Sequence, residues 1–309
     1  VDTEAYRPRD HHGRSTAAAT RHPASAASVG PETGAIRMSH HAKEARRLSI
    51  LDFPARKAAR EKISMVTCYD YTSAQVLNDT DVDTLLVGDS LAMVMHGFDS
   101  TVHATVDLMA LHISAVARGA PNKFIVGDMP FLAARKGLKD AMDGVQQLMQ
   151  AGAHSVKIEG EKGQVELMAH IVDSGVPVMG HLGLTPQSVH GLGGHKVQGK
   201  AEAEARALVD ASRRLEDAGC FALVLECVPT ELAREITQAI SIPTIGIGAG
   251  SHTDGQVLVL QDMLGMNPHF KPKFLKHYAQ GYEMMSSAVN RFDAEIRHGC
   301  FPTARESYK

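Results

Sequence analysis

Five short apolar runs in this chain each end in polar or charged residues. Short runs rich in Val, Ile and Leu are typical of strands buried on both faces of a parallel sheet. A buried strand that ends in an ionisable side chain is costly unless that side chain has a partner. We therefore expect the strand ends to converge on one polar site, as at the C-terminal face of a β/α barrel. The runs end in Asp89-Ser90, Asp128, Lys157-Ile158-Glu159, His181 and Glu226.

Length and composition favour a single large enzyme-like domain. The chain has 309 residues, of which 44% are hydrophobic, and its formal net charge is -3. This balance gives no reason to expect nucleic acid or a membrane as a partner, and 5% aromatic residues without Trp provide no stacking platform for bases. The 4 cysteines form no CxxC pair. We interpret them as reduced thiols, which favours a cytoplasmic location.

Residues 1–37 differ in composition from the rest of the chain. They are rich in Ala, Ser, Thr, Arg and His and contain almost no large aliphatic residues. Such a segment cannot bury enough apolar surface to offset the entropy of ordering it. We expect a disordered or non-native extension, and we favour Met38 as the true start. A transit peptide, which would make the location mitochondrial, is the alternative, although four acidic residues in the segment argue against it.

Residues 38–309 are predicted to form a single catalytic domain. Helical patterns separate most of the predicted strands, and repeated β-α units imply a parallel sheet. The predicted fold class is α/β, a (β/α)8 TIM barrel with an N-terminal capping helix within 41–60, where Pro54 breaks the pattern. The gap between the seventh and eighth predicted strands is too short for a full helix. Residues 274–298 are predicted to form one or two helices that close the chain. The eight strands are predicted near 63–67, 83–88, 123–127, 153–158, 176–180, 221–225, 242–247 and 256–260.

Two aspartates stand where a metal ion would explain them. Asp89 and Asp128 each follow an apolar run that ends in Val-Gly. Carboxylates brought together repel each other unless they are protonated or bridged by a cation. Mg²⁺ prefers oxygen ligands and leaves positions open for water and substrate. Glu159 could reach the same ion directly or through water. The competing interpretation makes these acids N-caps of the helices that follow.

The remaining strand-end residues suggest a bound anion and a proton acceptor. Lys157 and Glu159 project to one side of an extended strand, so Lys157 can meet an anionic substrate group or simply pair with an acid. Ser90 could bind a substrate carboxylate. Glu226 ends the most apolar strand, and a dry pocket there would make it a general base; pairing with Lys157 is the alternative. His181 is a candidate hydrogen-bond donor to substrate or a structural histidine.

The glycine-rich stretch from Gly246 to Gly250 has the spacing GxGxG. It differs from the GxGxxG dinucleotide fingerprint and precedes no long predicted helix. We expect these glycines to line the barrel mouth and to let a bulky ligand approach the backbone.

The motifs taken together resemble the ketopantoate hydroxymethyltransferase family. The resemblance runs in order from about residue 46 to the end of the chain, with small departures at Cys68, Gly127, His190 and His195. It is carried by the segments TCYDY (67–71), LVGDS (86–90), GDMPF (127–131), VKIEG (156–160), GHLGLTPQS (180–188), KVQG (196–199), LECVP (225–229), GIGAG (246–250) and TDGQ (253–256).

This resemblance implies an activity and a set of roles. The activity is transfer of a hydroxymethyl group from 5,10-methylenetetrahydrofolate to 3-methyl-2-oxobutanoate, which gives 2-dehydropantoate for pantothenate synthesis. It implies Mg²⁺ as cofactor and a homodecamer. By position in the motifs, Asp89, Asp128 and Glu159 would form the metal set. The residues that would contact the ketoacid are Asp89, Ser90, Asp128, Lys157 and His181, and Glu226 would accept the proton.

Two other function classes stay open at this point. One is a Mg²⁺-dependent C–C lyase of the isocitrate-lyase type, although the chain contains no Cys-bearing KKCGH-like segment. The other is a ligand-binding barrel without catalysis, which loss of Glu226 or of a metal-binding acid would favour; all of these residues are present.

Overall fold

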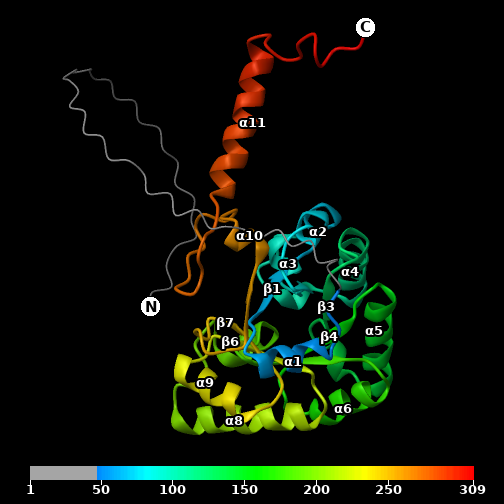
Figure 1. Cartoon of the computed structure of the whole chain (residues 1–309), viewed down its shortest axis with the longest axis vertical. Coiled ribbons are helices and arrows are strands. Elements are labelled where there is room, and N and C mark those ends of the chain that lie inside the picture. The colour runs from blue at the N-terminus through cyan, green and yellow to red at the C-terminus, as the bar shows by residue number, and fades with distance from the viewer. Residues whose placement is uncertain (1–46) are drawn as a thin grey trace, which may run out of the picture. The chain divides into compact units, whose positions relative to one another are not determined.

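The computed structural model describes residues 47–309, and the prediction for residues 1–37 lies outside them. Eight parallel strands pair in sequence order and close between the first and the last (Figure 1). The predicted eight-stranded barrel is therefore confirmed. The strands are β1 (Ile63–Thr67), β2 (Thr84–Val87), β3 (Phe124–Asp128), β4 (Ser155–Glu159), β5 (Val178–Gly183), β6 (Ala222–Glu226), β7 (Thr244–Ile247) and β8 (Gly255–Leu258).

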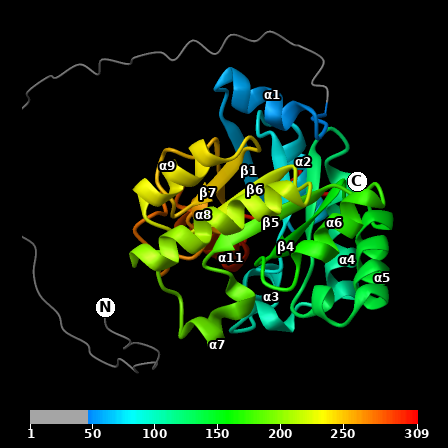
Figure 2. The ribbon, with the colours of Figure 1, turned by 90° about the horizontal axis from the view of Figure 1, so that it is seen from below.

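Helices surround the barrel and alternate with most strands (Figure 2). As the sequence predicts, the described residues 248–254 between β7 and β8 contain no helix. The α-helices are α1 (Asp52–Ala59), α2 (Tyr71–Asn78), α3 (Leu91–Val94), α4 (Val106–Gly119), α5 (Leu138–Gln150), α6 (Val165–Asp173), α7 (Val189–Leu192), α8 (Glu202–Asp217), α9 (Thr230–Ala239), α10 (Leu260–Met263) and α11 (Gly281–Arg297). Short 3₁₀ turns are η1 (Thr101–His103), η2 (Ala133–Arg135) and η3 (Pro186–Ser188).

Helix α1 closes the end of the barrel where the strands begin. Its one buried residue, Phe53, packs edge-on against Phe124 and Phe221, with ring centroids 5.2 and 4.9 Å away. These rings lie at the starts of β3 and β6, so the capping helix is confirmed. Pro54 was predicted to break the helical pattern, but α1 continues through it. It lies in the first turn, where a backbone N–H has no helical acceptor and its loss costs nothing.

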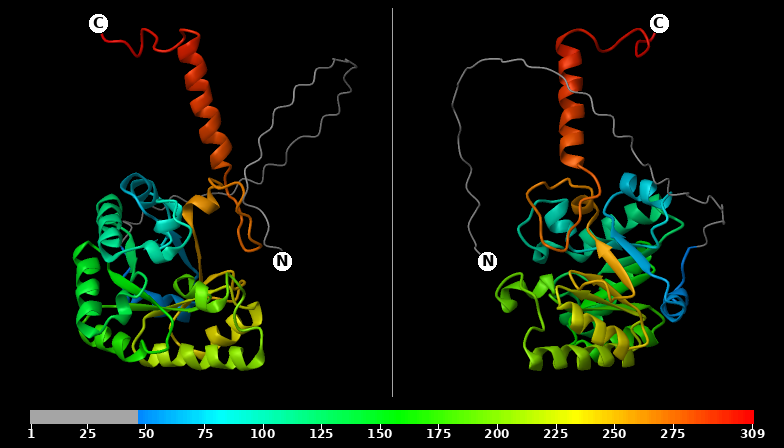
Figure 3. Two further views of the ribbon diagram at one scale, coloured as in Figure 1. Left: turned by 180° about the vertical axis from the view of Figure 1, so that it is seen from behind. Right: turned by 60° about the vertical axis from the view of Figure 1, so that its left-hand side comes forward.

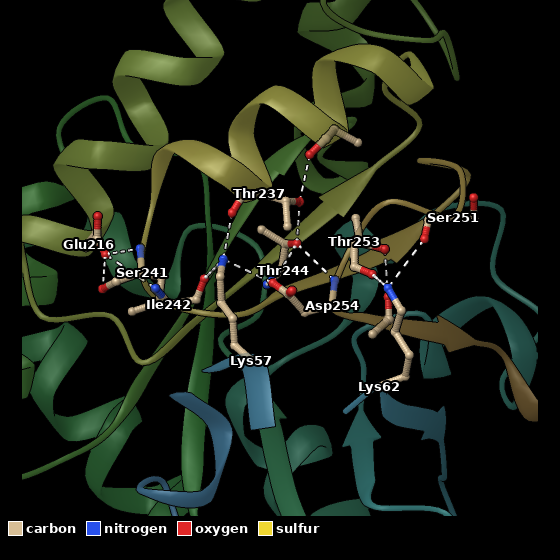
Figure 4. Close-up of polar contacts among 12 residues, drawn as sticks. Lys57, Lys62, Glu216, Thr237, Ser241, Ile242, Thr244, Ser251, Thr253 and Asp254 are labelled. Atoms are coloured by element: carbon tan, nitrogen blue, oxygen red, sulfur yellow. Dashed lines mark hydrogen bonds and ion pairs between the residues drawn. The ribbon is translucent and has the colours of Figure 1, made fainter. Parts of the chain in front are cut away.

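Two lysines make polar contacts at the end of the barrel where the strands begin, as Figure 4 shows. The ammonium group of Lys57 donates to the carbonyl oxygens of Thr237 (2.7 Å) and Ile242 (2.9 Å) and lies 3.1 Å from the carboxylate of Asp254. Lys62 donates to the carbonyl of Thr253. These contacts tie the N-terminal segment to the β7 and β8 region, so the opposite end of the barrel is the one left open for a site.

The C-terminal segment differs from the prediction. Residues 274–280 form no helix, and α11 begins only at Gly281. Gly281 is the only buried residue of α11, and in both views of Figure 3 the helix runs clear of the barrel. Its apolar side chains are therefore exposed. Among the described residues, no helix combines the length and the apolar character that a membrane crossing needs.

The glycine-rich stretch after β7 packs against the chain itself. A Cβ atom on Gly250 would lie 2.5 Å from the side chain of Thr230, and one on Gly248 would lie 3.1 Å from the ring of Phe274. Both glycines have positive φ, at 79° and 64°. The expectation that these glycines make room for a ligand is therefore wrong for these two positions, because neighbouring side chains fill the space.

Candidate active site

Asp89 and Asp128 meet at the carboxyl ends of β2 and β3, where both side chains are buried. The backbone N–H of Asp89 donates to the Asp128 carboxylate over 3.1 Å. Burial, followed by the charge of Asp128, raises the pKa of Asp89 well above its ordinary value, and burial likewise raises the pKa of Asp128. Ser90, not Asp89, occupies the N-cap of α3 and makes no side-chain cap there, so the N-cap interpretation of Asp89 is wrong.

Lys157 is a buried cation beside these acids. Its ammonium nitrogen lies 2.6 Å from Asp128 Oδ1, across the β3–β4 register that pairs the two residues. Burial alone would lower its pKa, but the charges of Asp128 and Glu159 outweigh that effect and raise it, so the side chain stays charged. The strand ends therefore bring one buried lysine together with three buried carboxyl groups.

His181 connects two further acids. Its Nδ1 lies 3.4 Å from Glu159 Oε1 and its Nε2 lies 3.3 Å from Glu226 Oε2. Burial and the charge of Lys157 oppose protonation, but the hydrogen bonds to the two glutamates prevail and raise the pKa of His181 to about 9. Lys157 Nζ also lies 3.2 Å from Nδ1. Because a protonated Nδ1 cannot accept from Lys157, we assign its hydrogen bond to Glu159.

The protonation of His181 predicts how stability depends on pH. The folded-state pKa of about 9 lies above the ordinary 6.5, so the imidazolium contributes stability that is complete below about pH 6.5 and is lost as pH rises to about 9. We expect the difference in unfolding free energy between wild type and His181→Asn to shrink by up to about 3 kcal/mol over this interval. Urea unfolding in EDTA measures it, and parallel pH profiles for the two proteins would contradict the assignment.

Glu226 and Ser90 are the more accessible members of the group. The Glu226 side chain is 21% exposed, whereas those of His181 and Glu159 are 3% and 4% exposed. The predicted dry pocket around Glu226 is therefore wrong, and so is its pairing with Lys157, because Glu226 faces His181. The Ser90 hydroxyl lies 2.8 Å from that of the buried Tyr69. Glu226 and Ser90 therefore lie where a ligand entering the open end of the barrel can reach them.

Gln187 belongs to the same group, although the sequence patterns did not single it out. Its side-chain amide donates to Asp89 Oδ2 (2.8 Å) and to the carbonyl of Met129 (2.9 Å). Its backbone N–H donates to Glu159 Oε2 over 3.1 Å. One residue of the turn η3, which follows β5, thus fixes the orientation of two of the acids. The one sequence feature that could have pointed to Gln187 is its place in the GHLGLTPQS segment, six residues after His181.

Replacing Gln187 tests this positioning. We expect Gln187→Ala to weaken binding of a divalent ion and to lower turnover, each by about 10- to 100-fold, because the Asp89 carboxylate loses the donor that orients it. Isothermal titration with Mg²⁺ and steady-state kinetics measure the two effects. Gln198→Ala, whose amide donates only to the exposed carbonyl of Lys196, is the matched control. Equal Mg²⁺ affinity in the two variants would refute the role.

The acids fit a divalent ion bound partly by water and substrate. Among residues 47–309, no three His, Cys, Asp or Glu side chains converge as a complete metal-binding group. Mg²⁺ commonly uses only one or two protein carboxylates and fills its other positions with water or substrate oxygens. The adjacent carboxyl groups of Asp89 and Asp128, buried together at the strand ends, match that requirement.

Comparison with known proteins decides the family. The model of the ketopantoate hydroxymethyltransferase family matches residues 47–304. The chain belongs to this family. A 3-methyl-2-oxobutanoate hydroxymethyltransferase of Bdellovibrio bacteriovorus is 55% identical over 260 residues, which cover 84% of this chain and 99% of that protein. One of Coxiella burnetii is 56% identical over 252 residues, covering 81% of this chain and 95% of that protein.

Solved structures outside the ketopantoate hydroxymethyltransferase family share the barrel. A 2,3-dimethylmalate lyase of the PEP mutase/isocitrate lyase superfamily has a TM-score of 0.54 at 15% identity, covering 84% of this chain and 91% of that one. The phosphoenolpyruvate phosphomutase of Streptomyces platensis subsp. rosaceus has a TM-score of 0.55 at 11% identity, covering 85% and 92%. At such identities the likeness extends to the fold alone.

Proposed function

We propose that the chain is a 3-methyl-2-oxobutanoate hydroxymethyltransferase. It transfers a hydroxymethyl group from 5,10-methylenetetrahydrofolate to 3-methyl-2-oxobutanoate and forms 2-dehydropantoate for pantothenate biosynthesis. The observation that carries this conclusion is the 55% identity to a protein of that name over 99% of its length. The acids, lysine and accessible glutamate at the strand ends are the groups that such chemistry needs.

The metal assignment rests on the excess of carboxylates. Asp89 and Asp128 would hold Mg²⁺, and Glu159 would reach it through water because His181 and the Gln187 backbone already contact its carboxylate. When bound, the ion polarises the ketoacid carbonyl and stabilises the enolate. Lys157 and Ser90 would bind the ketoacid, Lys157 by its charge and Ser90 by its hydroxyl.

Glu226 is the proposed proton acceptor. It is the most exposed of the strand-end acids, so its carboxylate can reach a substrate carbon at the mouth of the barrel. His181 Nε2 lies 3.3 Å from Glu226 Oε2 and can hold this carboxylate in position. After Glu226 takes the proton from C3, that carbon attacks the methylene carbon of the folate donor. Both bonds from this methylene to folate nitrogens break, and water supplies the oxygen of the new hydroxyl group. The two nitrogens take up the proton from C3 and one proton of the water.

We also propose that residues 38–309 form one catalytic domain and that the chains assemble into homodecamers in the cytoplasm. The exposed stripe of Met285, Val289, Phe292 and Ile296 along α11 supports assembly, because an apolar helix face of this length is normally covered. The free cysteines support a reducing compartment. Sedimentation equilibrium of wild type and Phe292→Glu tests the assembly; unchanged mass in the variant would count against this face.

An assay of product formation tests the activity. The full chain with Mg²⁺, 3-methyl-2-oxobutanoate and 5,10-methylenetetrahydrofolate should form 2-dehydropantoate, and EDTA should stop the reaction until Mg²⁺ is restored. A folded barrel that forms no product with all components present would overturn the proposal. Cleavage of a C–C bond in a 2-hydroxy acid, without folate, would favour the lyase alternative instead.

A further inference from the structure

A pair of histidines lies outside the group of acids. His96 follows α3 and is exposed, and His112 lies on α4 and is half-buried. Their Nε2 atoms face each other at 3.0 Å, with the rings nearly perpendicular at 87°. Two imidazoles that direct the same ring nitrogen at one point can share a proton or share a metal ion.

The surroundings of His112 fix which nitrogen carries its proton. Its Nδ1 contacts the backbone carbonyl of Tyr69, which can only accept a hydrogen bond. Nδ1 therefore carries the hydrogen, and the lone pair of Nε2 points toward His96. Metal-binding histidines are commonly oriented in this way, with the second ring nitrogen donating to a carbonyl or carboxylate.

We propose that His96 and His112 bind one divalent transition-metal ion of the Zn²⁺, Ni²⁺ or Cu²⁺ class. Two nitrogens bonded to one ion at about 2.0–2.1 Å lie about 2.8–3.4 Å apart for ligand angles between 90° and the tetrahedral value. The 3.0 Å separation in this pair falls within that range. Imidazole selects these ions over Mg²⁺, which prefers oxygen. Water completes the coordination, since the described residues offer no third His, Cys, Asp or Glu at this point.

The neighbouring polar groups leave the pair free for an ion. Asp99 lies 3.5 Å from His103, and the His103 ring stacks on Phe98 with centroids 4.5 Å apart. The Phe98 ring also stacks on His96, with centroids 6.5 Å apart. Among residues 47–309 no third His, Cys, Asp or Glu joins the two Nε2 atoms in a metal-binding group.

The bound ion would link α3 to α4. α3 begins directly after Ser90, and Tyr69 contacts both regions, through its hydroxyl to Ser90 and through its carbonyl to His112. An ion bound by His96 and His112 would therefore link the segment that carries Asp89 and Ser90 to helix α4. The expected consequence is a higher unfolding temperature of the Mg²⁺-saturated enzyme when the second metal is added.

The test compares three forms of the full chain in saturating Mg²⁺: wild type, His96→Asn and the control His195→Asn, which removes an exposed loop histidine. Comparison is needed because the chain has 17 histidines that can bind metal weakly. Equilibrium dialysis against Zn²⁺ should show one ion fewer per chain in His96→Asn than in the other two proteins. Zn²⁺ should raise the unfolding midpoint less in His96→Asn than in the other two.

Electron paramagnetic resonance of Cu²⁺ supplies a readout independent of stability. With one Cu²⁺ per chain, wild type and His195→Asn should show coupling to two imidazole nitrogens that is lost in His96→Asn. Equal Zn²⁺ binding and identical spectra in all three proteins would overturn the proposal and leave the pair as a neutral hydrogen bond. Folding of His96→Asn is checked by its turnover with Mg²⁺, which should match wild type.

Discussion

Glu226→Gln is expected to lower the rate of C3 proton removal from 3-methyl-2-oxobutanoate by about 10²- to 10⁴-fold. The amide has the size of the carboxylate and can still accept a hydrogen bond from His181, but it cannot take up a proton. Binding of Mg²⁺ should be unchanged, because Asp89 and Asp128 are untouched. Proton NMR of the ketoacid in D₂O follows the exchange directly, without the folate.

The control for this substitution is Glu231→Gln. Glu231 is an exposed glutamate on α9 that pairs with Arg234. It should leave exchange at the wild-type rate. Exchange that survives in Glu226→Gln at that same rate would show that another group is the base.

Lys157→Met is expected to destabilise the metal-free protein by about 3–5 kcal/mol. The substitution keeps an unbranched side chain one atom shorter than lysine but removes the cation that lies 2.6 Å from the buried Asp128 carboxylate. The cost comes from leaving buried acids without compensation. Adding Asp128→Asn removes part of that uncompensated charge, so the double variant should recover part of the loss. Urea unfolding in EDTA measures all three proteins.

Lys139→Met is the matched control. Lys139 Nζ lies 2.5 Å from Asp143, but the two side chains are 84% and 59% exposed, so solvent screens the pair. Its loss should cost far less stability than the loss of Lys157. Similar costs for Lys157→Met and Lys139→Met would mean that Lys157 does not compensate a buried charge in the way described.

The sequence predicted the barrel and the residues on its strand ends because both follow from local patterns. Short apolar runs locate the strands, and parallel strands place their carboxyl ends together, so the order of the strands is enough to expect Asp128 and Glu159 near each other. The side on which Lys157 projects follows from the two-residue period of a strand.

Contacts that depend on register and loops do not follow from local patterns. Lys157 pairs with Asp128, and Glu226 pairs with His181, not with Lys157 as the sequence suggested. Both pairings depend on how neighbouring strands align. Gln187 lies in the three-residue turn η3, which is too short for any periodicity to indicate where its side chain points. The mistaken start of the last helix has a similar cause, because residues 274–280 contain apolar side chains without forming regular structure.

A crystal structure with Mg²⁺ and 3-methyl-2-oxobutanoate tests the central claim most directly, namely that the strand-end acids and Glu226 form one catalytic site. We predict the metal bonded to carboxylate oxygens of Asp89 and Asp128, the ketoacid carboxylate near Ser90 and Lys157, and Glu226 within reach of C3. A metal and ketoacid bound elsewhere, or a C3 atom facing away from Glu226, would contradict the account.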